Sequence, residues 1–329
     1  MHKQLMVNMF NERIKGGGIS SISRDTSNIM KGALILLIVI GHNTVLTNNV
    51  SGLFDYLYSF HVLTFFILPW FYTTKFSWNS TIKRSTKLWF WYLAFFVVQV
   101  VFYNLLFDTT FSLSETIKAF FLGGHTLLKG VTGYMYLWFM PAFFFSMLIR
   151  DIYTIANKPS RIAMVLTSLG IVIFFAFRAY IIYNYIAVIQ GIFFAALGIV
   201  ASQLTLPTKN SHRALVVLLF VVCSVLMFID ATKGFVRPFM PFIAFFAIWS
   251  IIEWLKKYMN WLQSLGKLSM FIYLTHPLIF QFLLRVVPNN YSQVVYGIII
   301  LLLTTLISII VSWCMQQAIK VIPVVNRYL

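Results

Sequence analysis

Ten long apolar stretches dominate this sequence. A helix needs about 20 apolar residues to cross the hydrocarbon core of a bilayer. The ten stretches run approximately over 32–46, 53–72, 88–106, 134–149, 162–177, 185–204, 214–229, 238–255, 268–286 and 293–319. Soluble domains carry about 25% charged residues, whereas this chain carries 10%, and 60% of its residues are hydrophobic. The sequence therefore predicts an all-α polytopic membrane protein with about ten transmembrane helices.

The basic residues are distributed unevenly between the loops. With ten spans, both termini and every second loop lie on one side of the membrane. That side holds all but six of the 25 Lys and Arg residues; the six are Lys118, Lys129, Arg178, Lys233, Arg237 and Arg285. Cytoplasmic loops are enriched in Lys and Arg, so both termini are predicted to be cytoplasmic. The net charge of +17 comes from basic residues concentrated in the loops between apolar stretches. This distribution is typical of a membrane protein, so we expect no nucleic-acid partner.

No stretch looks like a soluble domain or a long linker. We expect one membrane-embedded domain over 1–329, with a cytoplasmic basic lead-in at 1–31, a ten-helix bundle at 32–319 and a cytoplasmic tail at 320–329. No small-residue cleavage site follows the first apolar run, so no cleaved signal peptide is expected. Cys223 and Cys314 lie within apolar runs, which indicates neither a disulfide framework nor a metal site.

The first candidate site is one face of the first apolar helix. Lys31 and His42 are eleven positions apart, which corresponds to roughly three turns and about 16 Å of rise along one face. The ammonium then lies near the membrane surface and the imidazole about halfway across. Ionisable groups inside a bilayer are costly and tend to mark function. A membrane histidine that is simply packed and hydrogen-bonded between helices is the alternative.

Two further histidines fall within apolar runs. The second span enters the membrane from the outer side, and His61 lies within it at a depth similar to that of His42. The two imidazoles are therefore expected to meet in the outer half of the bundle. Imidazole is a natural general base near neutral pH, and a proton relay in a transporter would use the same groups. His276 precedes Pro277, and a proline there frees a backbone carbonyl and can kink the helix, so a structural role is equally open.

Polar and aromatic residues mark both membrane surfaces. Arg84 and Lys87 share a face if they begin the third span as a helix. Together with Lys31 and Arg24 they would form a phosphate clamp for a nucleotide-bearing donor; anchoring to the membrane surface is the alternative. At the outer side, Tyr134, Tyr136 and Trp138 open the fourth run. They fit an interfacial aromatic belt or a platform on which a sugar ring stacks.

Taken in order, several blocks resemble the acyltransferase-3 family. The first-helix signature of that family, a basic residue, ten intervening positions and then histidine, is similar to the segment with Arg24, Asp25, Lys31, Gly32 and His42. SFHVLTFFILPWF (59–71) resembles its second-helix motif, except that LPWF replaces the usual Ser-Gly-Phe or Ser-Gly-Tyr. RSTK (84–87) resembles its Arg-x-x-Arg pair with lysine in the second place. YLWFMPA (136–142) and LGKLSMFIYLTHPL (265–278) resemble its later motifs.

This resemblance implies an integral-membrane O-acyltransferase of the cell (plasma or inner) membrane, a stand-alone member similar to sugar O-acetylases. The donor would be acetyl-CoA, and the acceptor a hydroxyl of a cell-surface or exopolysaccharide sugar. The implied catalytic residues are His42 and His61, with His42 as the base or a transient acyl carrier. Donor-binding roles fall on Lys31, Arg84, Lys87 and Arg24, and substrate-binding roles on Trp138, Tyr136, Tyr273 and His276. No metal is expected.

Two other functional classes suit the same pattern. A transporter or flippase of a glycan or lipid-linked intermediate would use the membrane histidines as proton relays. No inverted repeat or pair of broken helices, the features typical of transporters, is visible in the sequence. A scaffold subunit of a polysaccharide synthase would not need the face that carries Lys31 and His42. The expected partners are carbohydrate, which the family resemblance implies as acceptor, and membrane lipid around the apolar spans.

Overall fold

The computed structural model describes residues 21–72, 76–107, 112–133, 136–176 and 185–321. These residues form α-helices and short 3-10 turns, and no strand occurs among them. The elements are α2 (Arg24–His42), α3 (Thr44–Asn49), α4 (Leu53–Tyr58), α5 (His61–Ile67), η1 (Leu68–Phe71), α6 (Trp78–Phe107), α7 (Leu113–Leu122), α8 (His125–Thr132), η2 (Tyr136–Trp138), α9 (Phe139–Ile155), α10 (Lys158–Ala176), α12 (Ala187–Ser202), α13 (Asn210–Leu226), α14 (Asp230–Val236), η3 (Arg237–Phe239), α15 (Met240–Leu255), α16 (Asn260–Val286) and α17 (Gln293–Val321).

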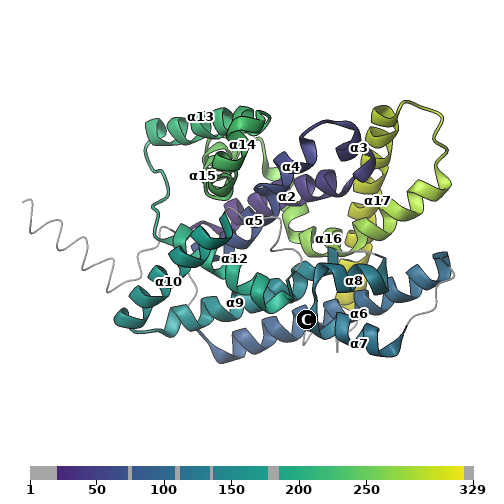
Figure 1. Ribbon diagram of the computed structural model, residues 1–329, viewed down its shortest axis with the longest axis horizontal. Helices are drawn as coiled ribbons and strands as arrows, with labels where there is room; N and C mark the ends of the chain where they lie inside the picture. Colours follow the sequence, from purple (N-terminus) through teal and green to yellow (C-terminus); the bar gives the residue numbers. More distant parts are fainter. Residues whose placement is uncertain (1–20, 73–75, 108–111, 134–135, 177–184, 322–329) are drawn as a thin grey trace, which may run out of the picture.

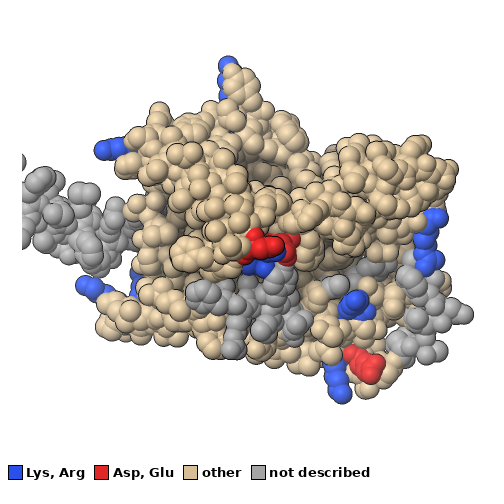
Figure 2. Space-filling view, turned by 45° about the horizontal axis from the view of Figure 1, so that its top comes forward, with Lys and Arg blue, Asp and Glu red and all other residues tan. Residues whose placement is uncertain are grey.

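Six helical stretches of the described chain are long and apolar enough to cross a membrane, and α12 and α13 are shorter apolar helices. On the face shown in Figure 2, charged side chains take up little of the surface. The all-helical membrane class is thereby confirmed, while ten spans and the side of the termini stay predictions. Tyr134, which begins the fourth predicted run, and the end of the fifth run at 177 lie outside the described residues.

The second and third apolar runs differ from the expected simple spans. The second run is interrupted at Phe60, whose φ of −143° and ψ of −35° separate α4 from α5. In the third, α6 begins at Trp78 and so includes the basic segment that precedes the predicted apolar run. No glycine or proline interrupts that segment, and long basic side chains can lie along the helix while their charges reach water. Arg84 and Lys87 are therefore helical, as the prediction of a shared face required.

Helix α2 lies in the middle of the molecule, beside α16 and α5 (Figure 1). Its contact with α16 is close because both helices carry glycine at the crossing. A Cβ on Gly32 would stand 2.1 Å from the Leu262 carbonyl oxygen, and one on Gly266 would stand 1.8 Å from the Asn28 carbonyl oxygen. Small residues let membrane helices approach until their backbones touch. This contact fixes α2 against α16, and both helices carry site residues.

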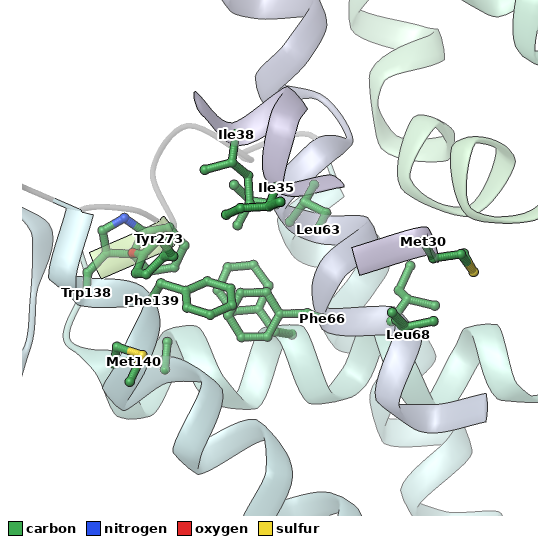
Figure 3. Close-up of a cluster of buried hydrophobic side chains, with 14 of the residues drawn as sticks. Met30, Ile35, Ile38, Leu63, Phe66, Leu68, Trp138, Phe139, Met140 and Tyr273 are labelled. Atoms are coloured by element: carbon green, nitrogen blue, oxygen red, sulfur yellow. The ribbon is translucent and has the colours of Figure 1, made fainter. Parts of the chain in front are cut away.

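An aromatic cluster joins the early, middle and late helices. Phe139 of α9 lies between Phe66 of α5 and Tyr273 of α16, with ring centroids 4.8 Å and 4.9 Å away (Figure 3). Trp138 is 5% exposed and belongs to the same core. The structure thus places Trp138 inside the bundle, since its indole packs on Phe66 with the rings nearly parallel.

Candidate functional site

The centre of the candidate site is a pair of buried histidines. Nδ1 of His42 lies 2.7 Å from Nε2 of His276, and the two residues are 6% and 1% exposed. His42 is the last residue of α2. The next residue, Asn43, accepts a hydrogen bond from the Leu46 amide and donates one from Nδ2 to the Gly297 carbonyl at 2.7 Å. The end of α2 is therefore held against α17.

The neighbours of His276 assign the protons on this pair. Nδ1 of His276 lies 2.9 Å from the Ile272 carbonyl oxygen, and a carbonyl can only accept. His276 Nδ1 therefore carries the proton, and in the neutral ring Nε2 is an acceptor. His42 consequently donates from Nδ1 to His276. The lone pair of His42 is then on Nε2, and no hydrogen bond to that atom is found within the described residues.

His61 lies next to this pair without a hydrogen bond to it. Its Nδ1 is hydrogen-bonded to the Leu57 carbonyl oxygen, so Nε2 is an acceptor, and this buried nitrogen has no hydrogen-bond partner among the described residues. A Cβ on Gly41 would stand 3.0 Å from that nitrogen. The sequence led us to expect His61 beside His42. The structure places His61 against the residue before His42 and makes His276 the direct partner.

Two tyrosines pack around the histidine pair. The Tyr136 ring centroid is 3.8 Å from that of His42, and the Tyr273 hydroxyl donates to the Tyr136 carbonyl oxygen. A narrow space adjoins the pair, lined among others by Tyr136, Phe280 and Thr304. Tyr136, Tyr273 and His276 thus gather at His42, whereas Trp138 lies in the core behind them.

A large cationic cavity opens at the other end of α2 and α16. It encloses about 860 Å³, within the usual range for small-molecule sites. The described residues that line it include no carboxylate and five basic side chains, those of Arg24, Lys31, Lys87, Lys267 and Lys320. All five belong to the side of the membrane that the charge distribution predicts to be cytoplasmic. The cavity is suited to a polyanion of the size of a nucleotide.

The structure separates Arg84 from the other predicted donor-binding residues. Arg84 forms an ion pair with Asp151 of α9, and the Thr81 hydroxyl donates to the same carboxylate oxygen at 2.6 Å. Arg84 does not line the cavity, because its guanidinium fastens α6 to α9. Sequence reasoning also missed Lys267 and Lys320. Lys267 lies in the LGKLSMFIYLTHPL segment that resembles a family motif, and Lys320 lies in the last turn of α17.

The comparison with family models gives one match. A family model described as an acyltransferase domain, that of the acyltransferase-3 family, matches residues 25–313. No match was found among curated proteins, and none among solved structures. Among the described residues, no group of three or more His, Cys, Asp or Glu side chains is placed to hold a metal ion.

Proposed function

The chain belongs to the acyltransferase-3 family, and we propose that it transfers an acetyl group from acetyl-CoA to a hydroxyl of a cell-surface sugar or exopolysaccharide. One observation carries this proposal. The same two packed helices, α2 and α16, hold the His42–His276 pair at one level and line the cationic cavity at another. Lys31 and His42 are separated by about 16 Å of helix rise. A donor bound by its phosphates in the cavity can therefore extend towards His42.

The cationic cavity is the proposed site of the donor phosphates. Lys31, Lys87 and Arg24 were expected in this role from the sequence, and Lys267 and Lys320 now join them. Hydrogen bonds between charged donors and phosphate oxygens are about twice as strong as neutral ones. The proposed donor is a CoA thioester because it combines several phosphates with a long arm that carries the acyl group.

His42 is the proposed general base. Its Nε2 lone pair accepts the proton of the acceptor hydroxyl while the hydroxyl oxygen attacks the thioester carbonyl. The new C–O bond forms, the C–S bond breaks, and His42 returns the proton to the departing thiolate. The His276 Nε2 lone pair, 2.7 Å from His42 Nδ1, stabilises the imidazolium that exists between these proton transfers, as the carboxylate does in a serine-protease triad.

The remaining groups are proposed to position the acceptor. Because Nε2 of His61 is an acceptor with no partner in the described part of the chain, it can take a hydrogen bond from a sugar hydroxyl. Tyr136 packs on His42 and limits the space beside it. The narrow space next to His42 includes the apolar side chains Phe280 and Leu301, which favours a short acyl group such as acetyl.

The decisive experiment compares wild-type protein with His42→Ala. Purified protein in detergent is mixed with radiolabelled acetyl-CoA, and both binding and slow hydrolysis are measured. Wild type should bind and hydrolyse the donor, and His42→Ala should bind with similar affinity but lose at least about 100-fold in turnover, as expected for loss of a general base. Equal turnover by a correctly folded His42→Ala protein would falsify the assignment of the base.

A further inference from the structure

Helix α17 carries a row of hydroxyl groups on its buried face. Thr304, Ser308 and Ser312 are spaced four residues apart, so they lie one above another on the helix, and they are 2%, 0% and 0% exposed. None of the three hydroxyl oxygens has a hydrogen-bond partner in the described part of the chain. The neighbouring Thr305 behaves in the ordinary way, since its hydroxyl donates to the Leu301 carbonyl oxygen at 2.7 Å.

The row runs between the two parts of the proposed active site. Thr304 lines the narrow space beside His42 and His276. Gln316, one turn beyond Ser312, lines the cationic cavity. Thr304 and Gln316 are twelve residues apart, which corresponds to about 18 Å of helix rise. Helix α17 packs against α16 and also touches α2, the two helices that carry the histidine pair.

Buried hydroxyls without partners are costly. Leaving one buried polar group unsatisfied costs about 1–3 kcal/mol, and such groups in native proteins call for an explanation. Packing of small residues between membrane helices explains why Ser and Thr stand at this interface. It does not explain why three successive inward-facing hydroxyls omit the carbonyl bond that Thr305 makes. A ligand with its own amide groups would satisfy them.

We propose that this row binds the amide-bearing arm of the CoA thioester, an inference that rests on the donor assigned above. The arm contains two amides, and at roughly 1.2 Å per bond of an extended chain it spans about 15 Å. Hydroxyls donate and accept hydrogen bonds, so Thr304, Ser308 and Ser312 can serve both the N–H and the C=O groups. The donor phosphates then lie in the cationic cavity and the thioester at His42. Because Ser308 and Ser312 are fully buried, α17 must move away from α16 to admit the arm.

The test removes the hydroxyls one at a time. Thr304→Val, Ser308→Ala and Ser312→Ala each delete a hydroxyl with little change in volume, and Thr305→Val is the matched control on the same helix. Each of the three should raise the donor KM for acetyl-CoA hydrolysis about threefold to tenfold, the worth of one hydrogen bond, and the triple variant more than tenfold. Thr305→Val should leave the donor KM unchanged.

Two additional measurements separate ligand binding from packing. With the acetyl thioester of mercaptoethanol, which has no amide, the double variant Ser308→Ala and Ser312→Ala should match wild type in KM. The unliganded melting temperature should not fall in the triple variant, since the deleted hydroxyls have no partners to lose. Unchanged KM for acetyl-CoA in an active triple variant would overturn this inference alone. A wild-type protein that neither binds nor hydrolyses acetyl-CoA would overturn the proposed donor and this inference together.

Discussion

At the scale of single residues, the functional interpretation depends on which nitrogen of each histidine carries the proton. The Ile272 carbonyl fixes the proton on Nδ1 of His276, and His276 in turn fixes the proton on Nδ1 of His42. This leaves Nε2 of His42 as the base. His276 is thus a positioning residue that acts on the acceptor through His42. A lone histidine in the same helix would be free to adopt the other tautomer.

The first residue-scale prediction concerns His276. His276→Leu removes the acceptor for His42 Nδ1, so kcat should fall about 10- to 100-fold, as is common when a residue supporting a functional histidine is lost. The donor KM should change little, because His276 does not line the cationic cavity. His276→Gln, whose side-chain oxygen can accept from His42, should recover part of kcat. The measurement is the kcat and donor KM of wild type, His276→Leu and His276→Gln. If His276 served packing alone, glutamine would not restore kcat.

The second residue-scale prediction concerns the donor phosphates. Lys87 lines the cationic cavity, whereas Lys83, one turn earlier on α6, is exposed and does not. Lys87→Gln should raise the donor KM about tenfold, because a hydrogen bond from a charged group to the donor contributes about 1.5–3 kcal/mol. Lys83→Gln should change the donor KM less than about twofold, because Lys83 makes no such bond to a donor in the cavity. Steady-state kinetics with acetyl-CoA provides the measurement. Equal effects of both substitutions would point to a general surface charge in place of a binding site.

At the scale of elements, the glycines of α2 and α16 decide how the site is assembled. Both lie in the segments whose residues resemble the family motifs, and the structure supplies a physical reason for them. Gly32 and Gly266 bring the two backbones into direct contact. Lys31 and His42 on one helix then face Lys267 and His276 on the other. Any larger side chain at this crossing would separate the two halves of the site.

We therefore predict that Gly32→Ala is strongly destabilising. The new Cβ would stand 2.1 Å from the Leu262 carbonyl oxygen, which belongs to backbone and cannot rotate away, so overpacking should cost about 1–3 kcal/mol or more. Gly170→Ala in α10 is the control, since nothing lies within 4 Å of its added Cβ. Thermal unfolding in detergent should show a lower melting temperature for Gly32→Ala than for wild type. The melting temperature of Gly170→Ala should not be lower than that of wild type. A Gly32→Ala protein as stable as wild type would mean that α2 and α16 are not in backbone contact.

At the scale of the whole molecule, the contacts between charged residues agree with the predicted sidedness. The five cations of the cavity come from four separate parts of the chain, and the charge distribution assigns every one of them to the cytoplasm. Both residues of the Arg84–Asp151 pair also fall on that side. The Lys233–Asp55 pair joins two residues assigned to the outer side. These contacts support ten spans with both termini in the cytoplasm, which remains our proposal.

The topology prediction can be checked with single cysteines. In a background with Cys223→Ser and Cys314→Ser, cysteine is introduced at Lys257, on the predicted cytoplasmic side, or at Lys118, on the predicted outer side. Both lysines are exposed. A membrane-impermeant maleimide should label intact cells only when the cysteine replaces Lys118, and permeabilised cells in both cases. Labelling of the Lys257→Cys protein in intact cells would require a different number of spans.

The amino-acid sequence by itself determined the membrane class, the approximate helical runs and several of the residues that the structure brings together. Hydrophobic length and charge bias are properties of local segments, so they are readable without a fold. His42, Lys31 and Lys87 were found this way, and so was the helical spacing of Arg84 and Lys87. The ordered blocks that resemble the acyltransferase-3 family pointed to the family that the comparison confirmed.

Only the tertiary structure decided which of these residues meet. Residues 42 and 276 are brought within hydrogen-bond distance because the glycines let α2 and α16 touch, and no local pattern specifies that partner. The packing of the helices also places His61 against Gly41 and pairs Arg84 with Asp151. It brings Lys267 and Lys320 into the lining of the cationic cavity. Hydropathy and spacing act along one helix, whereas partner choice depends on how distant helices pack. For that reason the sequence pointed to candidate residues, of which the fold brings some together and separates others, and only the fold assigned their partners.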